Sequence, residues 1–110
     1  MKKGILINAE DRTITEVEVN DNIAELIGVR TFACVDITET ETAFVDEEGL
    51  LNSPQHFITL EGYHDPLAGN ALILGFEYET AESVDTRLSL AEVKRLVKFH
   101  SRKEIVAMYV

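Results

Sequence analysis

The segment Tyr63-His64-Asp65 has the residue types most typical of a catalytic site in this chain of 110 residues. A histidine beside a carboxylate can act as a general base when the carboxylate orients the imidazole ring. Adjacent side chains of an extended loop point apart, so adjacency alone does not supply the orienting contact. We therefore predict a solvated loop without a catalytic residue, whose side chains are available to contact a partner.

Cys34 is the only cysteine in the sequence, so no disulfide can form within the chain. With His56 or His64 it could serve as a nucleophile, but a reactive thiolate needs a helix N-terminus or a cationic neighbour. The charge closest to it along the chain is Asp36, and it lies in an apolar, β-branched segment. We expect Cys34 to be a small buried core residue. An enzyme that uses His64 with Asp65 or Cys34 is the least favoured of three functional hypotheses.

Metal and cofactor sites are not predicted. The three histidines lack the spacing of metal ligands, and the sequence has no Cys-x-x-Cys or His-x-x-His pair. Asp46-Glu47-Glu48-Gly49 is an acidic turn, but it lacks the alternating oxygen ligands of a calcium-binding loop. The glycine-rich motifs that bind phosphate groups are also missing. We interpret Asp46, Glu47 and Glu48 as solvated side chains that can contact a partner.

Charge is distributed unevenly along the chain, whose net charge is −10. Residues 10–85 hold 18 acidic and 2 basic side chains, whereas residues 86–110 hold 6 basic and 2 acidic ones. A surface this acidic repels nucleic acid and anionic membranes, so neither is predicted as a direct partner. Lys94, Arg95 and Lys98 form a basic stripe that could contact an anionic partner or another copy, although a solvated helix face is the simpler interpretation.

Length and composition are typical of a single globular domain over residues 1–110, with 45% hydrophobic residues. No stretch approaches 18 consecutive apolar residues, so no transmembrane helix is predicted. The sequence shows no signal peptide and a single cysteine, which together favour a reducing cytoplasm.

The segment Ala71–Glu79 is predicted to be the strand around which the domain is built. The side chains that share one face at period two are Leu72, Leu74, Phe76 and Tyr78. The other face begins apolar and becomes acidic at Glu77, which predicts a strand covered on both sides at its start and on one side at its end. Gly75 in its middle indicates a bulge or the close approach of another backbone.

The N-terminal half predicts four strands and one short helix. In the second strand Ile14 is out of phase with Val17 and Val19, which indicates a bulge or an edge strand. Both faces of the third strand are apolar, which predicts a central position in the sheet. The predicted strands are Gly4–Asn8, Thr13–Val19, Thr31–Thr38 and Thr42–Asp46, and the helix lies between Asn22 and Gly28.

The C-terminal half predicts a long loop and one well-capped helix. The loop covers Gln55–Asn70, and the helix starts at the capping box Ser89-Leu90-Ala91-Glu92 and extends to His100 along an apolar stripe. Glu104–Val110 is an apolar tail that forms either a strand or a helix. Because such a tail needs a cover, residues 101–110 are expected to add a terminal strand or to join two copies in a homodimer.

The order of these elements is typical of an α+β domain. We predict a mixed, mainly antiparallel sheet of about five strands with two helices against one face. The chain starts with a ββαββ order, which is compatible with a β-grasp-like arrangement.

Two runs between residues 42 and 75 resemble a known family. They are Thr42-Ala-Phe-Val-Asp-Glu-Glu-Gly-Leu-Leu-Asn-Ser-Pro54 and Pro66-Leu-Ala-Gly-Asn-Ala-Leu-Ile-Leu-Gly75, and they are similar to the domain of unknown function 3846 family. The resemblance covers most of Ile5–Phe99. It implies a small protein of a kind common in phages and other mobile elements, and it implies no established activity and no functional residue.

The sequence favours a small cytoplasmic accessory protein that is not an enzyme and binds another protein, either from a host or as a second copy. Contact is expected through the acidic sheet or the Gln55–Asn70 loop. The alternative is a DNA-mimicking inhibitor of a host nucleic-acid-binding or defence protein, because rows of carboxylates can imitate phosphate spacing. The residues predicted to contact a partner are Tyr63, His64, Asp65, Asp46, Glu47, Glu48, Lys94, Arg95 and Lys98.

Overall fold

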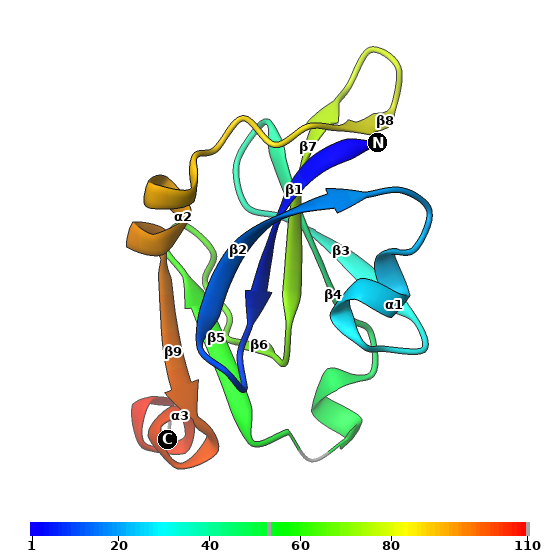
Figure 1. The fold of residues 1–110 in the computed structure, drawn as a ribbon. Helices are drawn as coiled ribbons and strands as arrows, with labels where there is room; N and C mark the ends of the chain where they lie inside the picture. The colour runs from blue at the N-terminus through cyan, green and yellow to red at the C-terminus, as the bar shows by residue number, and fades with distance from the viewer. Residues whose placement is uncertain (53, 110) are drawn as a thin grey trace.

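The structure of the protein, a computed structural model, describes residues 1–52 and 54–109. Its fold is α+β, as predicted. In these residues nine strands form two sheets, with three α-helices and a short 3₁₀ helix around them (Figure 1). All the strand pairs among them are antiparallel. The expected numbers of about five strands and two helices were therefore too low, and the β-grasp-like arrangement stays a prediction.

Sheet A is the larger of the two sheets, and sheet B packs against it. Sheet A contains β1 (Lys2–Asn8), β2 (Thr13–Val19), β3 (Phe32–Asp36), β4 (Glu41–Asp46), β7 (Ala71–Glu77) and β8 (Glu82–Val84). Sheet B contains β5 (His56–Leu60), β6 (Leu67–Ala68) and β9 (Val97–Ser101). The helices are α1 (Ile23–Ile27), the 3₁₀ helix η1 (Gly49–Asn52), α2 (Leu90–Leu96) and α3 (Arg102–Tyr109).

Strand β7 lies in the middle of sheet A, as its sequence predicted. The order of the sheet is β2-β1-β7-β4-β3, and β8 pairs with the last residues of β7. Ile73 belongs to a core that sheet A shares with sheet B, together with Ile5 and Ile58. Leu72 and Leu74 belong to a second core on the opposite face, which α1 covers. Each face of β7 therefore meets a different covering layer.

Strand β2 contributes to both cores, which explains its irregular pattern. Ile14 packs against the core shared with sheet B, whereas Val17 and Val19 pack on the side of α1. Pairing with β1 continues without interruption along the whole strand, so β2 has no bulge. It lies at one edge of sheet A, which confirms the second of the two predicted explanations.

Strand β3 lies at the other edge of sheet A, so the predicted central position was wrong. Ala33 and Val35 pack against the shared core, but Phe32 and Cys34 on the other face are exposed. The expectation that Cys34 is a buried core residue was therefore also wrong. Apolar side chains on both faces indicated burial, yet the structure leaves much of one face open.

Two predictions were wrong in the segments that form sheet B. The segment Gln55–Asn70 is not a long loop, because β5 and β6 form within it. Helix α2 begins at the predicted capping box but ends at Leu96, and the chain then forms β9, which pairs with β5 along its full length. Val97 and Phe99 alternate into the shared core. This burial at period two overrides the helical pattern that had been extended to His100.

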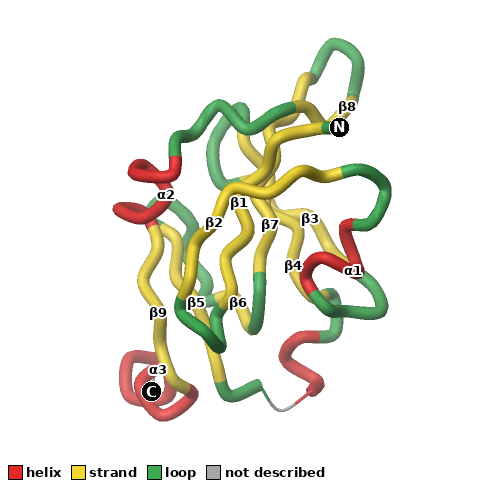
Figure 2. The backbone as a smooth tube through the Cα atoms, viewed as in Figure 1, coloured by secondary structure: helices red, strands yellow, loops and turns green. Residues whose placement is uncertain are grey.

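Helix α3 follows β9 directly, and Figure 2 shows α2 and α3 at the two ends of that strand. A second capping box starts α3, because the Ser101 hydroxyl accepts from the Glu104 N–H and the Glu104 carboxylate accepts from the Ser101 N–H. These two contacts, the backbone one first, lower the pKa of Glu104. The tail is therefore helical over the described residues, which do not include Val110.

A buried glutamate fixes the linker between β8 and α2. Glu41, whose side chain is 1% exposed, accepts hydrogen bonds from the Thr86 hydroxyl and from the Arg87 N–H at 3.1 Å. The Arg87 guanidinium lies 3.6 Å from its other carboxylate oxygen. Beside it, a Cβ on Gly75 would collide with the carbonyl oxygen of Asp85. The close approach of another backbone at Gly75 is thus confirmed.

Among the described residues, none of the helices has the length and apolar character needed to span a membrane.

Candidate functional site

His64 and Asp65 contact each other in the turn between β5 and β6. The His64 Nε2 atom lies 3.2 Å from an Asp65 carboxylate oxygen, so the expectation that these neighbours point apart was wrong. Their side chains are 82% and 64% exposed, however. Tyr63 packs on the core and holds its ring 5.2 Å from the imidazole. The pair is open to solvent, where an imidazole lacks the enclosing walls of an active site.

The acidic turn after β4 is partly neutralised. The Glu48 carboxylate accepts two hydrogen bonds from Arg30 Nη2, at 2.9 and 3.0 Å, and this contact raises the pKa of Arg30. Asp46 accepts from the Glu48 N–H, while the Glu47 side chain is exposed. A depression of about 260 Å³ lies between Arg30, Asp46 and Glu48. Its two carboxylates and one guanidinium give it no strong preference for either sign of charge.

The predicted basic stripe is split between two elements. Lys94 and Arg95 belong to α2, whereas Lys98 belongs to β9. Arg95 and Lys98 still border one depression of about 410 Å³, where α2 meets β5 and β9. In Figure 1, α2 and the acidic segment at η1 lie at opposite corners of the molecule. The structure therefore does not gather the predicted contact residues into one site.

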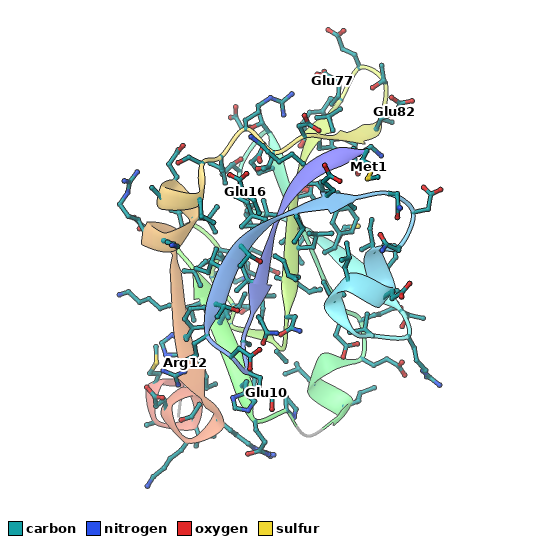
Figure 3. All side chains as sticks on the ribbon, in the orientation of Figure 1. Met1, Glu10, Arg12, Glu16, Glu77 and Glu82 are labelled. Atoms are coloured by element: carbon teal, nitrogen blue, oxygen red, sulfur yellow. The ribbon has the colours of Figure 1, made fainter. Side chains whose placement is uncertain are left out.

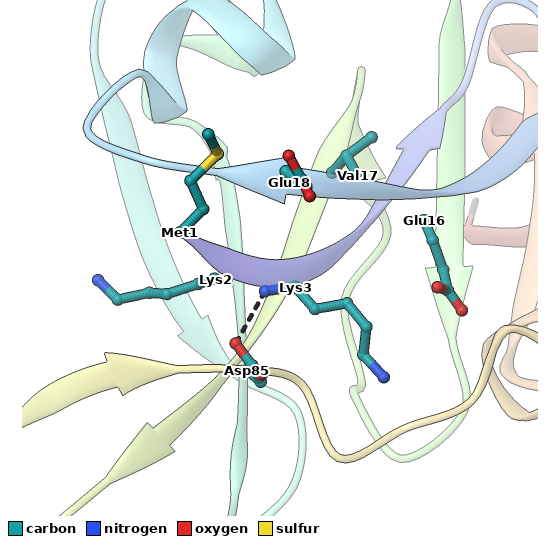
Figure 4. Close-up of a pocket in the computed structure, with 7 residues that line it drawn as sticks. All are labelled: Met1, Lys2, Lys3, Glu16, Val17, Glu18 and Asp85. Atoms are coloured by element: carbon teal, nitrogen blue, oxygen red, sulfur yellow. Dashed lines mark hydrogen bonds between the residues drawn. The ribbon is translucent and has the colours of Figure 1, made fainter.

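A further depression of about 390 Å³ lies where β1 and β2 meet the linker after β8 (Figure 4). The Lys3 N–H donates a 2.8 Å hydrogen bond to Asp85 there. The side chains of Lys2 and Lys3 diverge in Figure 4, and Glu16 and Glu18 face the same space. Side chains of both charges line this depression, so it does not favour either an anionic or a cationic ligand.

The open half of the α1 side of sheet A forms an apolar depression, which we name the aromatic groove. Its volume is about 360 Å³, and it crosses β3, β4, β7 and β8. Phe76 and Tyr78 contact each other edge to face with ring centres 4.9 Å apart. The residues that line the groove are Cys34, Asp36, Thr42, Phe44, Phe76, Tyr78 and Ser83.

The length of α1 explains why the groove stays open. The helix has only five residues and ends at Gly28, which adopts the left-handed conformation of a helix C-cap. Its apolar side chains cover Val19, Leu72 and Leu74, and they reach Phe44 at the border of the groove. The remaining aromatic residues stay accessible, and Tyr78 is 62% exposed. A contiguous apolar surface of this kind marks an interaction site more often than an isolated exposed side chain does.

Cys34 borders the groove but does not have the environment of a nucleophile. Partial burial raises the pKa of its thiol, and the negative charge of Asp36 raises it further. Both effects favour the neutral thiol at neutral pH. The expectation that Cys34 is not catalytic stays a prediction, but its side chain contributes apolar contact area to the groove.

Unpaired carboxylates lie along the strands and turns beside the groove. Asp36 and Glu82 are exposed and form no ion pair within the described part of the chain, and Glu39 and Glu79 in the adjoining turns do not either. Arginines instead pair with other glutamates, such as Glu48 and Glu77. The groove is thus an apolar surface with a net negative border.

Acidic side chains do not form one continuous row on the molecule. Figure 3 shows Glu77 and Glu82 at one end and Glu10 at the other, with Glu16 on β2 between them. Over residues 1–52 and 54–109 there is also no group of three or more histidine, cysteine, aspartate or glutamate side chains that could hold a metal ion.

Phe76, Tyr78 and Cys34 were not predicted from the sequence to be contact residues. A signal was present, because the apolar face predicted for Ala71–Glu79 continues to Tyr78, while the helix between Asn22 and Gly28 is predicted to be short. A helix that short cannot cover a sheet several strands wide, since it rises only about 1.5 Å per residue. The excess of apolar sheet surface over helix length is the pattern that indicates the groove.

Comparison with known proteins gives one match. A family model described as Domain of unknown function (DUF3846) matches residues 1–98. No curated protein and no solved structure matches the chain. The matched residues include the whole aromatic groove and end within β9, so α3 lies beyond them.

Proposed function

We propose that this chain, which belongs to the DUF3846 family, is a cytoplasmic protein-binding module without enzymatic activity, and that the aromatic groove contacts its partner. The observation that carries the proposal is an apolar sheet face that the chain leaves uncovered beside unpaired carboxylates. Aromatic side chains are enriched at the centres of protein interfaces. The role as an accessory protein of a phage or mobile element is supported by the family resemblance alone.

The chemistry of the groove selects the class of partner. Phe76 and Tyr78 favour apolar side chains, and Asp36, Glu39 and Glu82 favour lysine or arginine around them. A partner protein that presents apolar residues flanked by basic ones fits both properties. Nucleic acid does not fit the charge of the border, because its phosphates would be repelled by the same carboxylates.

Replacing Tyr78 with serine tests this proposal. Because Tyr78 is 62% exposed, we expect the free energy of unfolding to change by no more than about 0.5 kcal/mol. Partner capture from host lysate, quantified by mass spectrometry, should fall about tenfold or more, as expected when an aromatic anchor is removed. The matched control is Leu51→Ser, which removes an exposed apolar side chain from η1, away from the groove. Capture that survives Tyr78→Ser unchanged, or that Leu51→Ser reduces equally, contradicts the proposal.

The DNA-mimic hypothesis predicts a different result in the same experiment. Mimicry depends on carboxylates, so capture of a basic host protein should weaken steeply with salt and should be insensitive to Tyr78→Ser. Capture through the groove should depend on Tyr78 and respond less to salt. The scattered positions of the acidic residues do not favour mimicry (Figure 3).

The homodimer expected from the C-terminal tail stays a prediction with its own test. Val106 and Met108 on α3 are exposed, whereas Ile105 is buried against sheet B. If α3 joins two copies, light scattering should give a dimer mass for the full chain and a monomer mass for a chain that ends at Arg102. A monomer mass for both chains would refute the dimer and would leave the groove proposal untouched.

A further inference from the structure

The backbone of β3 has an open side along the groove. The Glu47 N–H donates to the Thr31 carbonyl, and the Ile37 N–H donates to the Glu41 carbonyl, at the two ends of the β3–β4 pair. Antiparallel partners exchange hydrogen bonds at every second residue, so the odd-numbered residues of β3 bond to β4. The N–H and C=O groups of Phe32, Cys34 and Asp36 therefore point to the opposite side, where no strand of the described chain pairs with them.

The side chains of the same three residues face the groove or lie beside it. Cys34 and Asp36 line it, and the ring of Phe32 contacts that of Phe44 edge to face, with centres 5.5 Å apart. All three residues are exposed. An additional strand at this edge would place every second side chain next to Phe32, Cys34 and Asp36, on the groove side of the sheet.

The edge strands β2 and β6 differ from β3. Proteins protect free edges with charged side chains, short strands or covering elements. Strand β2 carries Glu16 and Glu18 and packs beside α2, and β6 has only two residues. Strand β3 presents two apolar side chains and a single charge, so it is less protected than β2.

We infer that the partner adds an extended segment to β3 as a new edge strand of sheet A, with apolar side chains in the aromatic groove and basic side chains at its ends. This inference rests on the proposed protein-binding function and specifies how the partner is held. The carboxylates at the two ends of β3, Glu39 in the turn to β4 and Glu47 opposite its start, select the basic residues. Strand addition supplies affinity through the backbone and specificity through alternate side chains.

The same charges oppose a second copy at this edge. Two β3 strands that paired with each other would bring together two chains of net charge −10 and place their Asp36 side chains on one continuous face. Bringing like charges together in this way makes the free energy of association less favourable. The occupant is therefore a cationic segment of another protein.

A peptide with the sequence acetyl-Lys-Lys-Val-Thr-Val-Thr-Val-Lys-Lys-amide provides a direct test. Its core favours an extended strand and its lysines match the ends of β3. At millimolar peptide concentration, NMR hydrogen exchange should be about tenfold slower at the amides of Phe32, Cys34 and Asp36. Each of these N–H groups would then donate a hydrogen bond to the peptide backbone. A peptide with glutamates in place of the lysines should have no effect. Unchanged exchange at these three amides would overturn strand addition.

Methylation of the peptide backbone gives a second readout that does not depend on any variant of the protein. In a paired strand, alternate N–H groups face the neighbour. Methylating the central valine nitrogen and a threonine nitrogen beside it should therefore have unequal effects, with about a tenfold loss of affinity in one case and little in the other. Equal effects at both positions would contradict pairing with β3.

The variant Cys34→Pro removes an outward N–H without removing a hydrogen bond to β4, as edge strands permit. We expect it to fold and to lose peptide binding, while Leu51→Ser on η1, outside the groove, keeps binding. If the wild-type protein is a dimer that Cys34→Pro makes monomeric, β3 pairs with a second copy and the inference is wrong.

If Tyr78→Ser abolishes partner capture but the peptide leaves hydrogen exchange unchanged, strand addition fails and the protein-binding function stands. Capture unaffected by Tyr78→Ser refutes binding through the groove, on which strand addition rests.

Discussion

Replacing Glu41 with alanine is expected to lower the free energy of unfolding by about 2–4 kcal/mol, because two hydrogen bonds to a charged acceptor are lost. The Thr86 hydroxyl and the Arg87 N–H both donate to the same carboxylate oxygen. Thr86 is buried, so its hydroxyl would remain without water as a substitute partner. The desolvation cost of burying Glu41 itself is relieved in the variant, and this keeps the expected loss below the sum of the two bonds.

Glu48→Ala is the matched control for Glu41→Ala. Glu48 also pairs with an arginine, through three hydrogen bonds, but the Arg30 side chain is 82% exposed. Exposed ion pairs contribute no more than about 1 kcal/mol, so Glu48→Ala should have a small effect. Urea denaturation of both variants gives the comparison. Equal losses in the two variants would show that burial does not strengthen the contacts of Glu41.

Glu41→Gln separates charge from shape at the same position. The amide oxygen can still accept from Thr86 and Arg87, but the amide nitrogen replaces an oxygen that lies 3.6 Å from the Arg87 guanidinium. The side-chain NH₂ of the glutamine and the Arg87 guanidinium, both donors, would then face each other. We therefore expect the free energy of unfolding to fall by about half of the loss seen with alanine. A loss as large as that of Glu41→Ala would mean that the negative charge provides the whole effect.

The parts of the fold that local signals determine were predicted from the sequence. The early hairpin, the Ser89 capping box and the strand at β7 depend on residues within a few positions of each other. Gly75 was predicted to allow a close backbone approach, and Asp85 provides it. In each case the physical requirement is a turn, a cap or a period that the segment itself contains.

The parts that depend on neighbours in space were not predicted. Strand β3 has two apolar faces, which is the pattern of a central strand, but a pattern does not specify whether another element covers the second face. Val97–Ser101 contains too few residues to distinguish a helical from an alternating pattern, and pairing with β5 decides the outcome. The Gln55–Asn70 segment also showed no regular pattern, because β5 and β6 are too short to establish one.

The candidate site was missed because its residues come from distant segments. Cys34 and Tyr78 carry no motif that connects them, whereas charged turns are recognisable locally and were therefore predicted as contact sites. Glu41 carries no local signal of burial, because its partners Thr86 and Arg87 follow 45 and 46 residues later. A buried carboxylate has no sequence signature without knowledge of the donors that surround it.

Gly75→Ala is expected to lower the free energy of unfolding by about 2–3 kcal/mol, at the upper end of what one extra methyl group costs in a packed interior. The collision of its Cβ is with the carbonyl oxygen of Asp85, and a backbone atom cannot rotate away as a side chain does. Gly75 does not have a positive φ, so backbone strain does not contribute. Alanine would even reduce the entropy of the unfolded chain. The whole loss therefore reports the contact with the linker.

Gly69→Ala is the control for Gly75→Ala. Gly69 has φ of 82° and open space around its Cβ position, so alanine there adds backbone strain of about 1–2 kcal/mol without a collision. The two variants should differ in a second property. Gly75→Ala should speed hydrogen exchange at Thr86 and Arg87, whereas Gly69→Ala should leave both amides unchanged. A loss at Gly75 without faster exchange in the linker would refute the steric explanation.

The two substitutions should be non-additive, because Glu41 and Gly75 hold the same linker. Glu41 lies directly opposite Gly75 in the β4–β7 register, and Asp85, Thr86 and Arg87 pack over both. Once alanine at one position has displaced the linker, the second substitution has less structure to disrupt. The double variant should therefore lose about 1 kcal/mol less than the sum of the single variants, as residues that share partners do. Since the linker follows β8, whose Ser83 lines the aromatic groove, the same double variant should weaken partner binding while Gly69→Ala does not.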